Sequence, residues 1–140
     1  MTKKRILFIC THNSARSQLA EGLTNHYFAA TWEASSAGTV ATFVKPPAIH
    51  VLAELGIDIS HHTSKTIDQF RGQTFDVVVT VCDSARDTCP FFPGKQVIHQ
   101  SFVDPSNAPG SDADRLSAFR QTRDAIKAWL AQTLPKLSVS

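Results

Sequence analysis

Residues 4–17 read K-R-I-L-F-I-C-T-H-N-S-A-R-S, and this stretch decides what kind of fold the sequence encodes. After two basic residues the run to position 10 is apolar throughout, which is typical of a strand buried on both faces. Polar residues follow, and apolar side chains then recur at helical spacing, at Leu19, Leu23 and Tyr27. The stretch therefore predicts a buried strand over 4–10, a short polar loop, and a helix from 17 to about 31.

The rest of the chain continues this alternation of strands and helices. Further strands are predicted at 32–36, 75–81 and 97–100. Further helices are predicted from the pair Pro46 and Pro47 to Gly56, and from about 112 to 134, where Pro135 should end or kink the helix. Alternating elements of this kind indicate an α/β fold with a parallel sheet and right-handed crossovers.

Composition limits the classes of function. A chain of 140 residues with 42% hydrophobic and 19% charged residues suits one globular domain, which we place at 1–140. The net charge of +2 is too small to indicate nucleic acid or a membrane surface as a partner, and no apolar run is long enough to span a bilayer. The basic residues at 3–5 precede an apolar run shorter than the ~7–15 residues of a signal peptide. We therefore expect a cytoplasmic protein without a targeting segment.

The polar loop after the first strand is the candidate site, because parallel sheets bind ligands at this edge. Backbone N–H groups between Cys10 and Arg16 can turn inward around an anion, and the following helix adds positive charge. The Arg16 guanidinium can donate two hydrogen bonds to a tetrahedral oxyanion. The positive potential of this arginine and of the helix N-terminus also favours a Cys10 thiolate, which is nucleophilic. The alternative is an inert buried cysteine with an exposed arginine. The predicted oxyanion-binding residues are Thr11, His12, Asn13, Ser14, Ala15, Arg16 and Ser17.

This loop resembles the phosphate-binding loop of low-molecular-weight protein tyrosine phosphatases, and more closely that of the arsenate reductases built on the same fold. The resemblance extends over nearly the whole chain, in S-Q-L-A-E-G at 17–22, S-A-G at 36–38, D-I-S-H-H-T-S at 58–64, V-V-V-T-V-C at 77–82, D-T-C-P at 87–90, V-D-P at 103–105 and F-R-Q-T-R-D-A-I at 119–126. It implies a three-layer sandwich in which helices flank a four-stranded parallel sheet.

The sequence holds three cysteines, and so odd and sparse a set indicates reactive thiols rather than a secreted disulfide framework. Two of them, Cys82 and Cys89, follow the predicted strand at 75–81 and are separated by a polar spacer. Such a spacer would let the two sulfur atoms approach to disulfide distance. Two alternatives remain open: a zinc site with His99 as a further ligand, although the spacing matches no common zinc pattern, and two ordinary buried thiols.

The resemblance implies a redox function for these thiols. Cys10 attacks arsenate, Asp104 acts as the general acid, and arsenite leaves as a Cys10–Cys82 disulfide forms. Cys89 then forms the Cys82–Cys89 disulfide, which an external thiol donor reduces. Thioredoxin is the expected donor, with glutaredoxin or a small thiol as alternatives, and no cofactor is expected. Such an enzyme would serve arsenic detoxification.

The chain departs from the family at several positions. Ala15 stands where a further loop cysteine is common, and His12 replaces a glycine. The family's potassium site would correspond to Asn13, Glu21, Ser36 and an acidic residue at 65, but position 65 is a lysine. We therefore predict no metal, with the Lys65 ammonium beside Glu21 in place of potassium. The alternative is a solvated Lys65 on the surface.

Two other functions compete with the reductase. One is a tyrosine or aryl phosphatase that uses only Cys10, Arg16 and Asp104. Ser106 follows the D-P pair where such phosphatases usually carry a tyrosine, which argues against a tyrosine phosphate substrate. The other is a non-catalytic redox sensor or anion-binding module, which the intact set of three residues disfavours.

Overall fold

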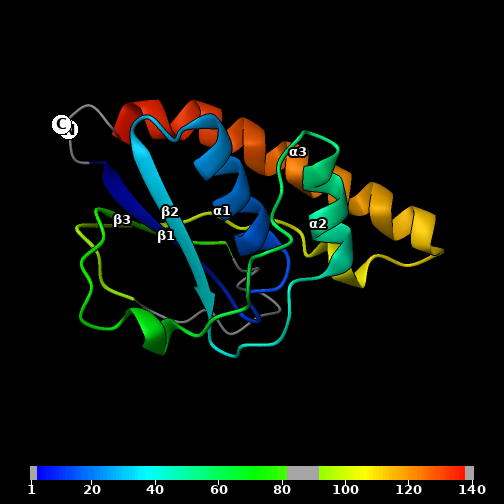
Figure 1. Cartoon of the computed structure of the whole chain (residues 1–140), viewed down its shortest axis with the longest axis horizontal. Helices are drawn as coiled ribbons and strands as arrows, with labels where there is room; N and C mark the ends of the chain where they lie inside the picture. The colour runs from blue at the N-terminus through cyan, green and yellow to red at the C-terminus, as the bar shows by residue number, and fades with distance from the viewer. Residues whose placement is uncertain (1–2, 82–91, 138–140) are drawn as a thin grey trace.

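Four parallel strands form one sheet in the computed structural model, which describes residues 3–81 and 92–137 (Figure 1). The strands lie in the order β2-β1-β3-β4. Their bounds are β1 Lys4–Cys10, β2 Trp32–Gly38, β3 Val77–Thr80 and β4 Gln96–His99. All three pairings are parallel, so the carboxyl ends of the strands meet at one edge of the sheet. The predicted α/β fold with a four-stranded parallel sheet is confirmed.

Three helices cover one face of this sheet: α1 Arg16–Tyr27, α2 Pro46–Ala53 and α3 Asp112–Leu137. Side chains alternate across β1, so Ile6 and Phe8 pack against the helices. Leu7 and Ile9 point to the opposite face, where the described cover is the 3₁₀ helix η1 Ile67–Phe70 together with connecting segments. All four side chains are fully buried, which explains the unbroken apolar run in the sequence.

Some predicted bounds were wrong. Helix α1 ends at Tyr27 rather than near 31, and Tyr27 is 41% exposed instead of facing the core. The chain turns there because the N–H groups of Thr31 and Trp32 both donate to the Phe28 carbonyl. Helix α3 continues past Pro135 to Leu137, so this proline does not end the helix. Helix α2 ends at Ala53 rather than running to Gly56, although Gly56 has the predicted cap conformation, with φ at 81°, in the turn that follows.

An ion network fastens α2 to α3. Arg123 donates to the Val51 carbonyl oxygen at 2.8 Å and to Glu54 Oε1 at 2.9 Å. Arg120 adds a bidentate contact to the same carboxylate, with its shortest N–O distance at 2.7 Å. Hydrogen bonds from Arg120 lower the pKa of Glu54 to about 2, so this carboxylate stays ionised at neutral pH.

Over residues 3–81 and 92–137, no helix is both long and apolar enough to cross a membrane.

Candidate active site

The predicted oxyanion loop lies between the end of β1 and the start of α1. Cys10 is the last residue of β1 and Arg16 the first of α1. Asn13 has φ at 50°, a left-handed conformation that asparagine tolerates better than most residues. The Ser14 carbonyl accepts from Lys45 N–H, and the Thr11 carbonyl accepts from Val40 N–H, so the segment after β2 braces the loop. His12 is exposed, whereas Asn13, Ser14, Ala15, Arg16 and Ser17 are buried.

Glycine is required at the end of β2 because the loop passes so close to it. A Cβ atom at Gly38 would lie 2.6 Å from the Thr11 carbonyl oxygen and 2.8 Å from the Asn13 nitrogen. Both are backbone atoms, which cannot move aside without distorting the loop. The S-A-G motif therefore shapes the candidate site from the neighbouring strand.

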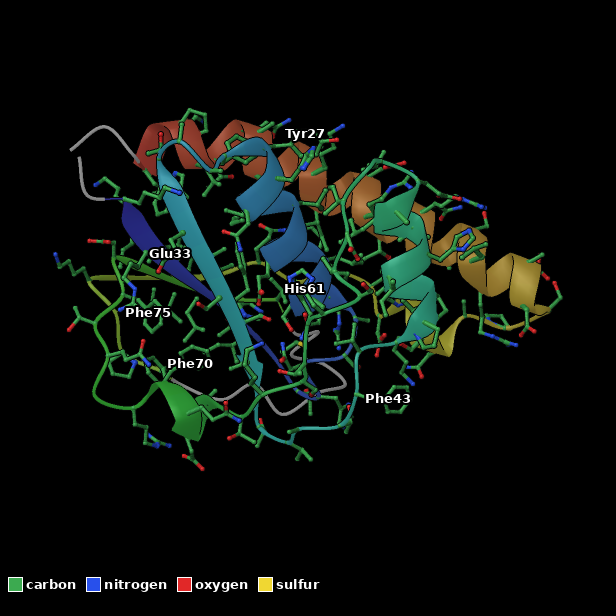
Figure 2. The ribbon with its side chains drawn as sticks, in the orientation of Figure 1. Tyr27, Glu33, Phe43, His61, Phe70 and Phe75 are labelled. Atoms are coloured by element: carbon green, nitrogen blue, oxygen red, sulfur yellow. The ribbon has the colours of Figure 1, made fainter. Side chains whose placement is uncertain are left out.

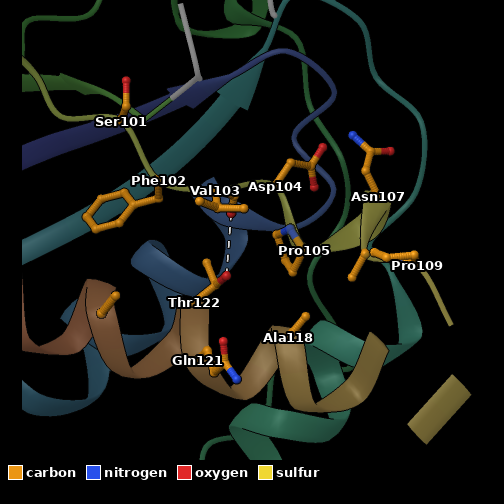
Figure 3. A pocket seen from close by; sticks show the side chains of 12 residues that line it. Ser101, Phe102, Val103, Asp104, Pro105, Asn107, Pro109, Ala118, Gln121 and Thr122 are labelled. Carbon is orange, nitrogen blue, oxygen red and sulfur yellow. Dashed lines mark hydrogen bonds between the residues drawn. The ribbon is translucent and has the colours of Figure 1, made fainter. Parts of the chain in front are cut away.

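Arg16 and Asp104 meet at this loop although they are far apart in the sequence. Arg16 is 3% exposed, its Nη1 donates to the Phe102 carbonyl at 3.3 Å, and its Nη2 lies 3.5 Å from Asp104 Oδ2. The other carboxylate oxygen of Asp104 accepts from Ser106 N–H at 3.0 Å. Figure 3 shows the carboxyl group of Asp104 pointing away from α3, while Pro105 lies on the side that faces α3. The structure thus brings a carboxyl and a guanidinium to the loop that holds Cys10.

Behind this segment lies a hollow of about 610 Å³ (Figure 3). It separates residues 101–109 from the face of α3 that carries Ala118, Thr122 and Ala125. The hollow flanks the loop that carries Asp104 rather than the candidate thiol. Cys82 and Cys89 fall outside the described residues. The two predicted disulfides and the alternative zinc site depend on these cysteines and therefore stay predictions.

The Cys10 sulfur lies at the end of a chain of buried hydrogen bonds. It is 2.8 Å from Ser17 Oγ, which accepts from Asn13 Nδ2 at 2.8 Å. Asn13 Nδ2 also donates to Ser36 Oγ at 2.9 Å, and Ser36 donates to Glu21 Oε1 at 2.6 Å. This series of hydrogen bonds therefore runs from the thiol to the Glu21 carboxylate, and Glu21 is only 9% exposed.

Lys65 lies beside that carboxylate. Its Nζ is 3.8 Å from Glu21 Oε1 and donates to the Thr63 carbonyl at 2.9 Å, while its backbone N–H donates to Asn13 Oδ1 at 2.8 Å. Four-fifths of the Lys65 side chain is buried, unlike a solvated surface lysine. An ammonium in this place repels a cation, so these residues do not fit a potassium ion. Nor do the described residues hold a group of three or more metal-ligating side chains.

Two residues of this site, one buried and one partly buried, were not singled out from the sequence. Gln18 is fully buried, and its Oε1 accepts from His62 Nδ1 at 3.0 Å. His62 Nδ1 also lies 3.4 Å from Glu21 Oε2. Burial lowers the pKa of His62, against the opposing effect of Glu21, so this imidazole is neutral at neutral pH. Both residues lie within the quoted motifs 17–22 and 58–64, but nothing in those motifs indicated that their side chains meet.

The parallel α/β sheet brings a cysteine, an arginine and a carboxyl to one loop at its carboxyl edge, which is the architecture of phosphatase-like proteins. The family model described as low molecular weight phosphotyrosine protein phosphatase matches residues 5–139. The chain is 47% identical over 127 residues to the arsenate reductase of Halalkalibacterium halodurans, which covers 90% of this chain and 91% of that protein. The chain therefore belongs to the low molecular weight phosphotyrosine protein phosphatase family, in its arsenate reductase branch.

Solved structures agree with this assignment. An arsenate reductase in the phosphate binding state superimposes with a TM-score of 0.79 at 30% identity, over 96% of this chain and 98% of that one. A thioredoxin-dependent arsenate reductase of Corynebacterium glutamicum gives a TM-score of 0.64 at 30% identity, over 95% of this chain and 63% of that one.

Proposed function

We propose that this chain reduces arsenate to arsenite, with Cys10 as the nucleophile. The observation that carries the proposal is the convergence of Cys10, Arg16 and Asp104 on one loop in a chain whose relatives are named arsenate reductases. The Arg16 guanidinium and the inward N–H groups of the loop suit a tetrahedral oxyanion. The hydroxyl of Ser17, 2.8 Å from the sulfur, stabilises a Cys10 thiolate.

The first step forms a sulfur–arsenic bond. The Cys10 thiolate attacks arsenic, and the hydroxyl group of hydrogen arsenate leaves as water after it takes one proton from Asp104. Asp104 is suited to this because its carboxyl lies 3.5 Å from Arg16, within reach of an anion bound there. Arg16 binds the remaining oxygens and balances the charge that develops on them.

The second step reduces arsenic. The Cys82 thiolate attacks the Cys10 sulfur, the sulfur–arsenic bond breaks, and its electron pair leaves with arsenic as arsenite. The thiolate of Cys89 then attacks Cys82 and releases Cys10, and an external dithiol reduces the resulting Cys82–Cys89 disulfide. We propose thioredoxin as that dithiol, with support from the thioredoxin-dependent neighbour.

A coupled assay tests the whole proposal. With thioredoxin, thioredoxin reductase and NADPH present, arsenate should cause NADPH oxidation that depends on both the chain and thioredoxin. Replacing thioredoxin by glutaredoxin with glutathione and glutathione reductase separates the two donors. No arsenate-dependent oxidation with either donor would refute the reductase.

Aryl phosphate hydrolysis is the second candidate function, since phosphate and arsenate have nearly the same shape and charge. It needs only the described trio of Cys10, Arg16 and Asp104, which is present. The same preparation assayed with an aryl phosphate measures this activity directly. A rate of aryl phosphate hydrolysis well above the rate of arsenate reduction would make the protein a phosphatase first and a reductase second.

Lys65 should make the protein indifferent to potassium. The thermal midpoint Tm should be the same in potassium as in a bulky organic cation at equal ionic strength, because an ammonium already lies beside Glu21. Lys65→Asp should leave oxygen ligands around Glu21 and make Tm rise with potassium concentration, because the cation binds only the folded state.

Lys136→Asp is the matched control, since it makes the same change of charge on the last turn of α3 and should stay unresponsive. A potassium-specific rise of Tm in the unsubstituted protein would show that Lys65 does not exclude the cation.

A further inference from the structure

We propose that Gln18 is a positioning residue that sets the direction of the hydrogen bonds ending at the Cys10 sulfur. The inference rests on the proposed function in that it takes the Cys10 thiolate as the reacting group. Gln18 lies in the first turn of α1, is fully buried, and takes no part in the chemical steps above. A buried amide is expected to satisfy all its hydrogen-bonding groups, so its partners show what it does.

The Lys65 backbone N–H fixes the orientation of the Asn13 amide, because a backbone N–H can only donate. Lys65 N–H points to the side-chain amide of Asn13 at 2.8 Å, so the atom that faces it must be the acceptor, Oδ1. Gln18 Nε2 donates to the same Oδ1 at 3.0 Å. With two donors on its oxygen, the Asn13 amide must turn its nitrogen to the other side, towards Ser17 and Ser36.

The orientation of Gln18 is determined in the same way. Its nitrogen faces three oxygens that only accept: Asn13 Oδ1, the Asn13 carbonyl at 3.2 Å and the Thr63 carbonyl at 3.0 Å. Its own oxygen faces His62 Nδ1, and a neutral imidazole with its proton on Nδ1 donates to it. A reversed amide would place an oxygen against three oxygens, so Gln18 has one orientation only.

The direction of donation then passes to the thiol. Ser17 Oγ accepts from Asn13, which leaves its own proton free to point to Cys10 Sγ at 2.8 Å. A hydroxyl that donates to sulfur stabilises the thiolate relative to the thiol. In the other branch, Ser36 accepts from Asn13 and donates to Glu21, which as a carboxylate can only accept.

Without Gln18, one donor instead of two holds the Asn13 amide in this orientation. Asn13 Oδ1 would keep only the Lys65 N–H, and the Asn13 carbonyl would lose its contact to the Gln18 amide. An Asn13 amide held by that one donor rotates more easily, and the rotated amide presents its oxygen to Ser17. The Ser17 proton would then be drawn to that oxygen and away from the sulfur.

The test measures the alkylation rate of Cys10 by iodoacetamide as a function of pH. It uses the full chain with Cys82→Ser and Cys89→Ser, so that Cys10 is the one remaining thiol of the three in the sequence. Gln18→Met keeps the length of the side chain and removes its hydrogen bonds, and Gln18→Glu keeps the shape and removes the donor. Both should raise the Cys10 midpoint of the pH profile by about one unit. At any pH below both midpoints, the thiolate fraction should then be about tenfold smaller than in the parent protein.

The other charged or titratable groups around the loop stay in place in these variants: Arg16 and Glu21 on α1, Asp104 on the 101–109 segment, His12 in the loop, and His62 and Lys65 on the segment after α2. A change of midpoint shared by both variants therefore reports the hydrogen-bond direction. Leu23→Ala is the stability control, since Leu23 is fully buried on the same helix and outside the network. It should lower Tm and leave the midpoint unchanged.

A double-mutant cycle tests the route. Asn13→Ala should raise the midpoint by itself, and adding Gln18→Met should then raise it no further, because the effect of Gln18 passes through Asn13. A Gln18→Met protein with a lower Tm and the unsubstituted midpoint would overturn the proposal, as would a shift that persists in the Asn13→Ala protein. If instead the unsubstituted Cys10 reacts no faster at neutral pH than a small free thiol, the proposed nucleophile itself fails.

Discussion

Cys10→Ser should abolish arsenate reduction and aryl phosphate hydrolysis alike, with a loss of at least about a thousandfold in each. Both reactions begin with attack by the same sulfur, and a serine hydroxyl at neutral pH is a far weaker nucleophile than a thiolate. The substitution changes one atom at a buried position, so the fold should be retained.

Anion binding supplies the control for this variant. Arg16 and the loop N–H groups remain, so phosphate should still raise Tm in the Cys10→Ser protein. Unchanged binding with lost turnover assigns Cys10 to the chemistry rather than to the binding site. Substantial turnover by Cys10→Ser, in either assay, would remove Cys10 from the role of nucleophile.

Replacing Cys82 or Cys89 by serine should separate the two chemistries. Either variant should lose multiple-turnover arsenate reduction, again by at least about a thousandfold, because the disulfide relay is broken. Aryl phosphate hydrolysis should stay within about twofold, because water, and not a second thiol, completes that reaction. The comparison of both activities in one preparation gives each variant its own internal control.

The two variants should also differ from each other. Cys89→Ser should stop after one turnover with a Cys10–Cys82 disulfide, which peptide mass mapping detects. Cys82→Ser cannot form that disulfide, and it should retain a free Cys10. Normal steady-state reduction after replacement of both thiols would rule out the relay, while leaving the role of Cys10 untouched.

Local sequence was sufficient for the fold and for the family. The apolar run at 4–10, the polar loop and the following helix are contiguous, and their burial and periodicity depend on neighbours along the chain. The α/β fold and the family resemblance were predicted and are confirmed. The ends of α1 and α3 were predicted wrongly because a turn at Phe28 and a tolerated Pro135 depend on what lies beside them.

The interior of the site was harder to predict, because its side chains come from β1, α1 and the segment 62–65. His61, labelled in Figure 2, immediately precedes this segment. The sequence placed Cys10 and Arg16 on one loop, because the residues between them form a single turn of chain. The approach of Phe102 to Arg16, 86 positions away, and of His62 to Gln18, 44 positions away, exists only once the chain has folded.

The sequence by itself determined the polar loop between β1 and α1, the alternation of strands and helices, and the family. Only the tertiary structure decided between a Lys65 ammonium beside Glu21, now found at 3.8 Å, and a solvated lysine, and only it showed that the buried Gln18 amide donates to Asn13. The reason is physical: the direction of a buried hydrogen bond depends on every donor and acceptor packed around it, and these come from segments that the linear order keeps apart.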